Sequence, residues 1–110
     1  MTAEFGHHYI AGKWLSDAPN GFSEVENPSD GSIIGTAPNG SAGLAENAVM
    51  AAREAFESTD WGSNPRQRAA ALLEFADILE RRADEIAALM ARENGKVLAQ
   101  ARHEVAAGYG

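Results

Sequence analysis

The chain has 110 residues, a hydrophobic content of 45% and a formal net charge of −7. This length and composition predict one small folded segment and exclude extensive disorder, while the acidic balance argues against nucleic-acid and membrane-surface partners, which require basic faces. The absence of cysteine excludes disulfides and thiolate chemistry from the chain itself.

The first forty residues predict strands and turns. Residues 1–8 carry neither a secretory leader nor an apolar run, so we expect a flexible N-terminus on a soluble, cytoplasmic protein. Residues 9–15 (YIAGKWL) predict a β-hairpin that turns at Ala-Gly. Residues 22–26 and 32–37 predict a second hairpin, because the intervening Asn27–Gly31 (NPSDG) combines proline with Asp-Gly.

The remaining residues predict three helices. Ser41 is a candidate N-cap for the first, whose apolar stripe comprises Leu44, Ala45, Ala48, Val49, Ala52, Ala55 and Phe56. Asn64-Pro65 predicts the start of the second, which runs to a stop at Gly95. That span is about thirty residues against a usual ~11–12, so we expect a bend or break near Arg82–Asp84. The third begins at about Leu98.

The sequence contains no motif that assigns a catalytic or cofactor-binding residue. Neither the dinucleotide-binding glycine pattern nor the phosphate-binding loop occurs. His103-Glu104 begins like a zinc-protease helix, but Ala107 stands where the second histidine is required. His7-His8 could hold a metal loosely or belong to a mobile terminus, and Gly40–Gly43 could hold an anion or form a flexible loop. We favour the second interpretation of each pair.

The order of several short motifs nevertheless resembles the amino-terminal portion of the aldehyde dehydrogenase superfamily, from about residue 9 to residue 110. These motifs are Gly-x-Trp, Asn-Pro-x-x-Gly, Ala-Arg-x-Ala-Phe, a downstream Trp, Pro-x-x-Arg and Glu-x-Gly-Lys. The resemblance implies an α/β parent fold. This segment would supply two N-terminal β-hairpins and then three α-helices of a truncated NAD(P)-binding domain, residues 9–110.

The resemblance also implies a function for an intact parent enzyme, the oxidation of an aldehyde to a carboxylic acid with NAD or NADP. In that family a cysteine attacks the aldehyde, hydride passes to the nicotinamide, and a glutamate activates water to release the acid. With no cysteine, we expect this chain to be an N-terminal fragment that is inactive alone and that self-associates through exposed apolar faces, its parent being a homo-oligomer. The alternative is a stand-alone, non-catalytic interaction or assembly module derived from the family.

One family site implies specific residues of this chain. Many members hold a monovalent cation between a backbone carbonyl just before the Asn-Pro turn and an acidic residue in the Glu-x-Gly-Lys stretch. The corresponding positions are Val25, Glu26 and Glu93. Hard cations prefer such oxygen ligands. The alternative is that Glu93 is a solvated residue at a helix end.

Overall fold

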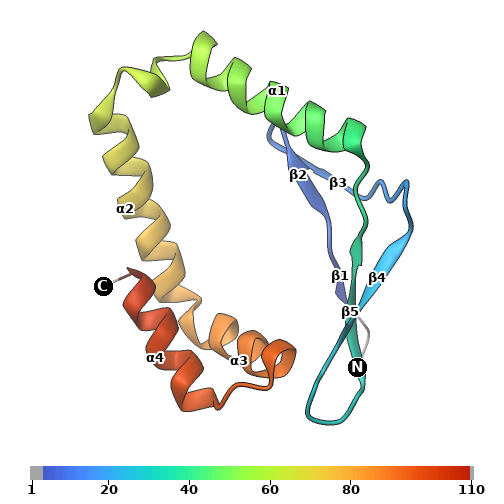
Figure 1. Cartoon of the computed structure of the whole chain (residues 1–110). Helices are drawn as coiled ribbons and strands as arrows, with labels where there is room; N and C mark the ends of the chain where they lie inside the picture. Colours follow the sequence, from blue (N-terminus) through green and yellow to red (C-terminus); the bar gives the residue numbers. More distant parts are fainter. Residues whose placement is uncertain (1–3, 110) are drawn as a thin grey trace. The chain divides into compact units, whose positions relative to one another are not determined.

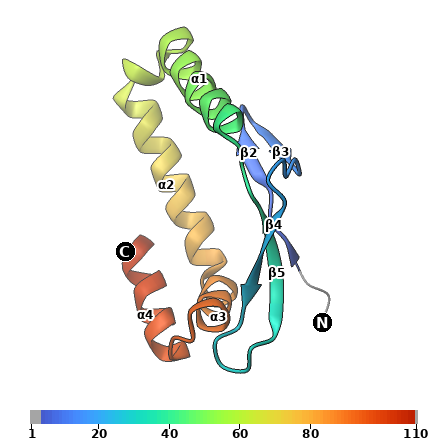
Figure 2. The ribbon, with the colours of Figure 1, turned by 45° about the vertical axis from the view of Figure 1, so that its right-hand side comes forward.

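The computed structural model describes residues 4–109 and contains two groups of elements (Figures 1 and 2). Contacts divide the chain into a first unit, which extends to Val25 and includes Ile33–Asn64, and a second unit, which comprises Glu26–Ser32 and the residues from Pro65 onward. The elements in chain order are β1 (Glu4–Phe5), β2 (His8–Ile10), β3 (Lys13–Leu15), β4 (Phe22–Glu26), β5 (Ile33–Pro38), α1 (Ala42–Ser58), the 3₁₀ turn η1 (Asp60–Gly62), α2 (Pro65–Arg81), α3 (Ala83–Asn94) and α4 (Leu98–Tyr109).

Strands β2 and β3 form the first predicted hairpin. They pair antiparallel with Tyr9 opposite Trp14, and the two rings lie 4.8 Å apart. The turn residues Ala11 and Gly12 both have positive φ, at 52° and 76°. Two successive left-handed residues match the twist of a two-residue hairpin, and glycine adopts this conformation without strain whereas alanine does not. The prediction of a hairpin here is confirmed, with Ala11 as its strained position.

Strands β1, β5 and β4 form a three-stranded sheet with β5 in the centre. The β4–β5 hairpin confirms the second predicted hairpin. Strand β1 pairs parallel with β5, Glu4 opposite Gly35, and Gly35 is buried. Part of the segment 1–8 that we expected to be flexible therefore forms strands, since β1 lies within it and β2 begins at its last residue.

Helix α1 begins as its cap predicts. Ser41 is extended, and its Oγ accepts a hydrogen bond of 3.2 Å from the backbone N–H of Leu44. This bond satisfies one of the donors left free at a helix start. Helix α1 contacts β2, and the half-buried residues Leu44, Ala48 and Ala51 are spaced to share one face of the helix. The hairpin thus covers only part of the predicted apolar stripe.

The second expected helix is two helices, so the structure has four α-helices where the sequence predicted three. Helix α2 ends at Arg81 and α3 begins at Ala83. The N–H of Arg82 is shared between the carbonyls of Ile78 and Leu79, at 3.1 and 3.2 Å, which marks a tightened final turn. Acidic residues in the first turn of α3 favour a new helix start, because they complement the helix dipole. The predicted break near Arg82–Asp84 is confirmed.

The core of the second unit lies between helices α3 and α4, and it is small. Ala87 of α3 and Ala101 of α4 are fully buried. An exposed ion pair from Arg102 to Asp84, with Nε 3.0 Å from Oδ1, joins the same helices. Gly95 ends α3 in the left-handed conformation at φ 67°, as predicted. No helix among residues 4–109 combines the length and hydropathy needed to cross a bilayer.

Candidate functional site

The turn between β4 and β5, Asn27–Ser32, is held by its own polar side chains. Asn27 Oδ1 accepts from the Ser29 N–H at 3.0 Å, and the Asn27 N–H donates to the Ser32 carbonyl at 2.8 Å. Asp30 Oδ1 accepts from both the backbone N–H and the Oγ of Ser32, at 2.9 and 2.7 Å. Gly31 adopts φ 72°, which a side chain would strain. The turn chemistry read from the sequence therefore produces a loop that is closed by its own hydrogen bonds.

This turn lies against the C-terminal end of α3 within the second unit. A Cβ added to Gly95 would be 2.9 Å from Cγ of Pro28, so the two residues are in close contact. The hydrogen bonds from Ser32 lower the pKa of Asp30, and the positive charge of Arg92 adds to that effect. Residues more than sixty positions apart in the sequence thus meet here, and the contact brings the Asn-Pro turn to the Glu-x-Gly-Lys motif.

Two of the three predicted cation ligands flank this contact. Glu26 ends β4 and is exposed, and its Oε1 would lie 3.6 Å from a Cβ on Gly31, so its carboxylate lies over the turn. Glu93 is exposed in the last turn of α3, where helix carbonyls lack partners within the helix. Val25 is half-buried in β4 and belongs to the first unit. The donors available in the second unit are oxygens, which is the chemistry that a hard cation requires.

Other candidate ligands do not form a site in the part of the chain that the structure describes. No three His, Asp or Glu side chains among residues 4–109 gather as a metal centre. His8 lies in β2 with Nε2 buried and unbonded, and His103 is exposed on α4. The first turn of α1 has no basic residue, and the Ser41 side chain accepts a hydrogen bond from one of its free N–H donors. These residues do not fit a nicotinamide dinucleotide.

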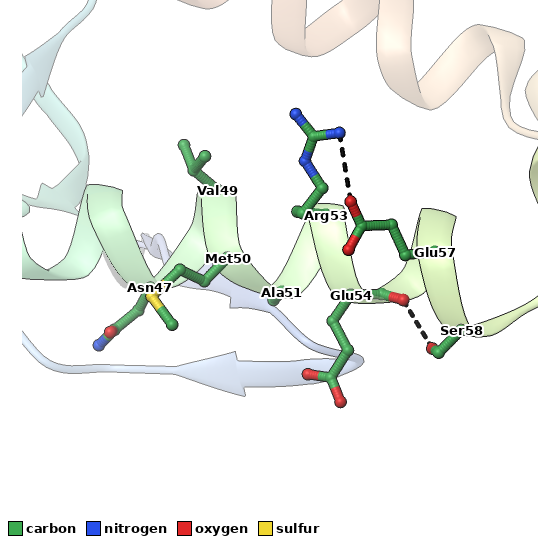
Figure 3. A pocket seen from close by; sticks show the side chains of 8 residues that line it. All are labelled: Asn47, Val49, Met50, Ala51, Arg53, Glu54, Glu57 and Ser58. Atoms are coloured by element: carbon green, nitrogen blue, oxygen red, sulfur yellow. Dashed lines mark hydrogen bonds and ion pairs between the residues drawn. The ribbon is translucent and has the colours of Figure 1, made fainter.

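Helices α1 and α2 leave large apolar side chains exposed. Val49, Met50 and Phe56 of α1 are 69%, 62% and 55% exposed. In α2, three further large apolar side chains are more than half exposed, namely Leu72, Leu73 and Phe75. Figure 3 shows the open hollow along α1, where Val49 and Arg53 project to one side of the helix and Asn47 to another. Exposed apolar faces were expected from the sequence, and Val49, Phe56, Leu72 and Leu73 lie on such faces in the described chain.

Comparison with known proteins identifies the fold. The aldehyde dehydrogenase family model matches residues 14–110. Among curated relatives, malonate-semialdehyde dehydrogenase of Bacillus pumilus is 37% identical over 102 residues, covering 92% of this chain and 21% of its own length. Alpha-ketoglutaric semialdehyde dehydrogenase of Bacillus subtilis is 40% identical over 103 residues, with 92% and 21% covered.

A solved structure agrees with these matches. The NAD-dependent aldehyde dehydrogenase of Sinorhizobium meliloti superposes with a TM-score of 0.88 at 30% identity, over 94% of this chain and 21% of that one. The chain therefore spans about a fifth of the length of the relatives it matches. Its fold is that of the amino-terminal portion of an α/β oxidoreductase. The chain belongs to the aldehyde dehydrogenase family.

Proposed function

We propose that the chain is the amino-terminal scaffold of an NAD(P)-dependent aldehyde dehydrogenase, which oxidises an aldehyde to a carboxylic acid, and that it has no activity by itself. The observation that carries the proposal is the family match over residues 14–110. Four further properties are predictions for the parent enzyme: activity on an aldehyde, use of NAD or NADP, assembly as a homo-oligomer and a cytoplasmic location.

The role of these residues in such an enzyme is positional. When bound, the nicotinamide cofactor supplies the hydride acceptor, and the nucleophile is a cysteine that this chain lacks. The chain's own contribution is to hold individual elements in place. Ser41 fixes the start of α1, and the Pro28–Gly95 contact fixes the Asn-Pro turn on the end of α3. A site built on such supported elements is more precisely placed than one built on free loops.

We further propose that Val25, Glu26 and Glu93 contribute oxygen ligands to a monovalent cation in the parent enzyme. The donors that support this are the carboxylate of Glu26 over the turn and that of Glu93 at the end of α3. The negative end of the helix dipole also favours a cation there. The ion would steady this part of the scaffold and take no part in bond making. Replacing sodium or potassium by a bulky organic cation should then lower thermal stability, and Glu93→Gln should remove that difference.

A chimaeric enzyme tests the main proposal. The matching 103-residue segment of the Bacillus subtilis relative is replaced by this chain, and formation of reduced nicotinamide is followed with its semialdehyde substrate. We expect activity from the chimaera and none from the 110-residue chain alone. The relative carrying its own segment is the control. A chimaera that stays inactive while this control is active would contradict the proposal, as would turnover by the isolated chain.

The exposed apolar residues favour one alternative, a non-catalytic module that self-associates or binds another protein. Val49 and Leu73 are each 69% exposed, and exposed apolar patches commonly mark interaction surfaces. This alternative predicts that the isolated chain melts cooperatively and forms a defined species, and analytical ultracentrifugation combined with thermal melting would detect both.

A further inference from the structure

The tetrapeptide Ala-Pro-Asn-Gly occurs twice in the chain, at residues 18–21 and 37–40, and both copies belong to the first unit. The two copies are hydrogen-bonded to each other. The backbone N–H of Asn39 donates to the Gly21 carbonyl at 2.8 Å, within a set of backbone and side-chain bonds that joins the two loops. Each copy therefore presents an Asn-Gly dipeptide in surroundings that the fold defines.

An Asn-Gly dipeptide can modify itself. The backbone nitrogen of glycine is able to attack the side-chain amide carbon of the preceding asparagine, because glycine has no side chain to hinder the approach. The chain contains three such dipeptides, namely Asn20-Gly21, Asn39-Gly40 and Asn94-Gly95. Their sequences alone do not separate them, so any difference in reactivity comes from the folded structure.

The attacking nitrogen is free in only one of the three dipeptides. The Gly21 N–H donates to the Ala18 carbonyl at 2.9 Å, which occupies the nitrogen. Asn94 is the last residue of α3, and a helical residue directs the following N–H back toward the carbonyls of the preceding turn. The Gly40 N–H has no acceptor among the residues that the structure describes. The nucleophile is therefore available at Asn39-Gly40.

The side-chain amide of Asn39 is polarised for attack. Its Oδ1 accepts a hydrogen bond of 2.9 Å from Ser23 Oγ. This donor lies at the oxygen on which negative charge develops when the amide carbon is attacked, so it stabilises the transition state. The departing nitrogen Nδ2 is held only by a bond of 3.3 Å to the Asn20 carbonyl, which is beyond the usual N–H···O range.

A base also lies beside this dipeptide. A Cβ added to Gly40 would be 3.5 Å from Cε1 of His8 and 3.9 Å from its Nε2, so the imidazole lies against Gly40. His8 Nε2 is buried and has no hydrogen-bond partner in the described chain, which is unusual for a polar atom. An unpaired imidazole nitrogen can accept a proton from a reacting group. His8 and Gly40 also line one hollow of about 450 Å³, which has room for water.

We propose that Asn39-Gly40 is a site of self-catalysed deamidation, assisted by Ser23 and His8. The Gly40 nitrogen bonds to Asn39 Cγ, and its proton passes to His8 Nε2. The bond from Cγ to Nδ2 then breaks, and ammonia leaves with that proton, so that a five-membered imide remains. Water adds to either imide carbonyl and opens the ring to aspartate or isoaspartate. Water is the only co-reactant, and the proposal is independent of the proposed function.

The modification would act on the start of α1. Asn39 lies two residues before Ser41, whose Oγ caps the helix by accepting from the Leu44 N–H. Isoaspartate adds a carbon to the main chain at this point, which displaces the cap. In either product a carboxylate oxygen faces the Asn20 carbonyl where Nδ2 donated before, so an attraction becomes a repulsion. Deamidation is therefore expected to loosen the contact between the two loops.

The first experiment compares the three dipeptides within one chain. The 110-residue chain is incubated in native buffer and in urea, and peptide mapping by mass spectrometry follows conversion of each asparagine. In urea the three rates should be similar. In native buffer we expect Asn39 to convert about fivefold or more faster than Asn20 and Asn94, and no slower than in urea. Similar native rates, or faster conversion at another asparagine, would overturn the proposal, and so would a chain that does not fold, because its three rates would be alike.

The second experiment tests the assisting groups. Ser23→Ala and His8→Phe should each slow conversion of Asn39 in native buffer by about tenfold and leave its rate in urea unchanged. Ser16→Ala and His103→Phe are the matched controls, since both residues are exposed and neither contacts this dipeptide. A rate within about twofold of the matched control would refute the role of that residue. Circular dichroism shows whether each variant folds, and the comparison among dipeptides decides the proposal if one does not.

Discussion

Substitution of Gly95 by alanine should destabilise the second unit through two separate effects. Gly95 ends α3 at φ 67°, where a residue with a Cβ is strained by about 1–2 kcal/mol. The new Cβ would also lie 2.9 Å from Cγ of Pro28, a distance that forces one of them to move. Overpacking of this kind costs about 1–3 kcal/mol, and the exposed Pro28 can shift, so the lower end applies. We expect a total of about 2–3 kcal/mol.

A double-mutant cycle separates the two effects. Pro28→Ala removes the clashing Cγ, so Gly95→Ala in that background should cost only the backbone strain of about 1–2 kcal/mol. The measurement is urea unfolding followed by circular dichroism, with amide hydrogen exchange reporting on the end of α3. A cost below about 0.5 kcal/mol for Gly95→Ala, or strict additivity with Pro28→Ala, would refute the reasoning that this contact positions the Asn-Pro turn.

Three further predictions concern local devices of the fold. Ala11→Gly should stabilise the β2–β3 hairpin by about 1 kcal/mol, because Ala11 is strained at φ 52°. The urea concentration at the unfolding midpoint should rise, while the dependence of the unfolding free energy on urea concentration stays unchanged. Ser41→Ala should cost about 0.5–2 kcal/mol and speed amide exchange at Leu44, whereas Ser41→Asp should retain the cap and leave both nearly unchanged. Because hydrogen bonds from Ser32 lower the pKa of Asp30, its carboxylate stabilises the fold at pH values above the ordinary carboxyl pKa, and this contribution is lost as the pH falls through the folded-state pKa. Asp30→Asn should therefore weaken the dependence of the unfolding free energy on pH in the acid range. An unchanged dependence would contradict a stabilising role for this carboxylate.

The features predicted from the sequence are those that local chemistry decides. Ser41 caps α1, Gly95 ends α3 and Pro65 opens α2 because each acts on the backbone within one turn of itself. The turn Asn27–Ser32 likewise closes through its own side chains. These signals were sufficient to place both hairpins and the break after Arg81, though not to count the helices that the break creates.

The features that the sequence did not predict depend on distant partners. Strand β1 exists because two residues pair with β5, some thirty positions later, and a two-residue strand has no periodicity of its own. The Pro28–Gly95 contact also joins separate motifs, and only the family resemblance connected them. Val25, Glu26 and Glu93 were predicted as cation ligands from that resemblance and not from any local pattern. Periodicity defined the stripe of α1 but not which half of it the hairpin covers.

The distribution of buried side chains supports the proposal that these residues are the scaffold of a larger enzyme. In the described chain, the hydrophobic side chains that are fully buried are alanines, Ala87 and Ala101, whose burial releases little apolar surface. Leu72, Leu73 and Phe75 would each gain about 1.5–3 kcal/mol from complete burial, yet more than half of each remains exposed. An autonomous domain buries its largest apolar groups first, because they contribute most to the free energy of folding. Here the order is inverted, which is the pattern expected if, as proposed, another part of a larger enzyme covers these helix faces.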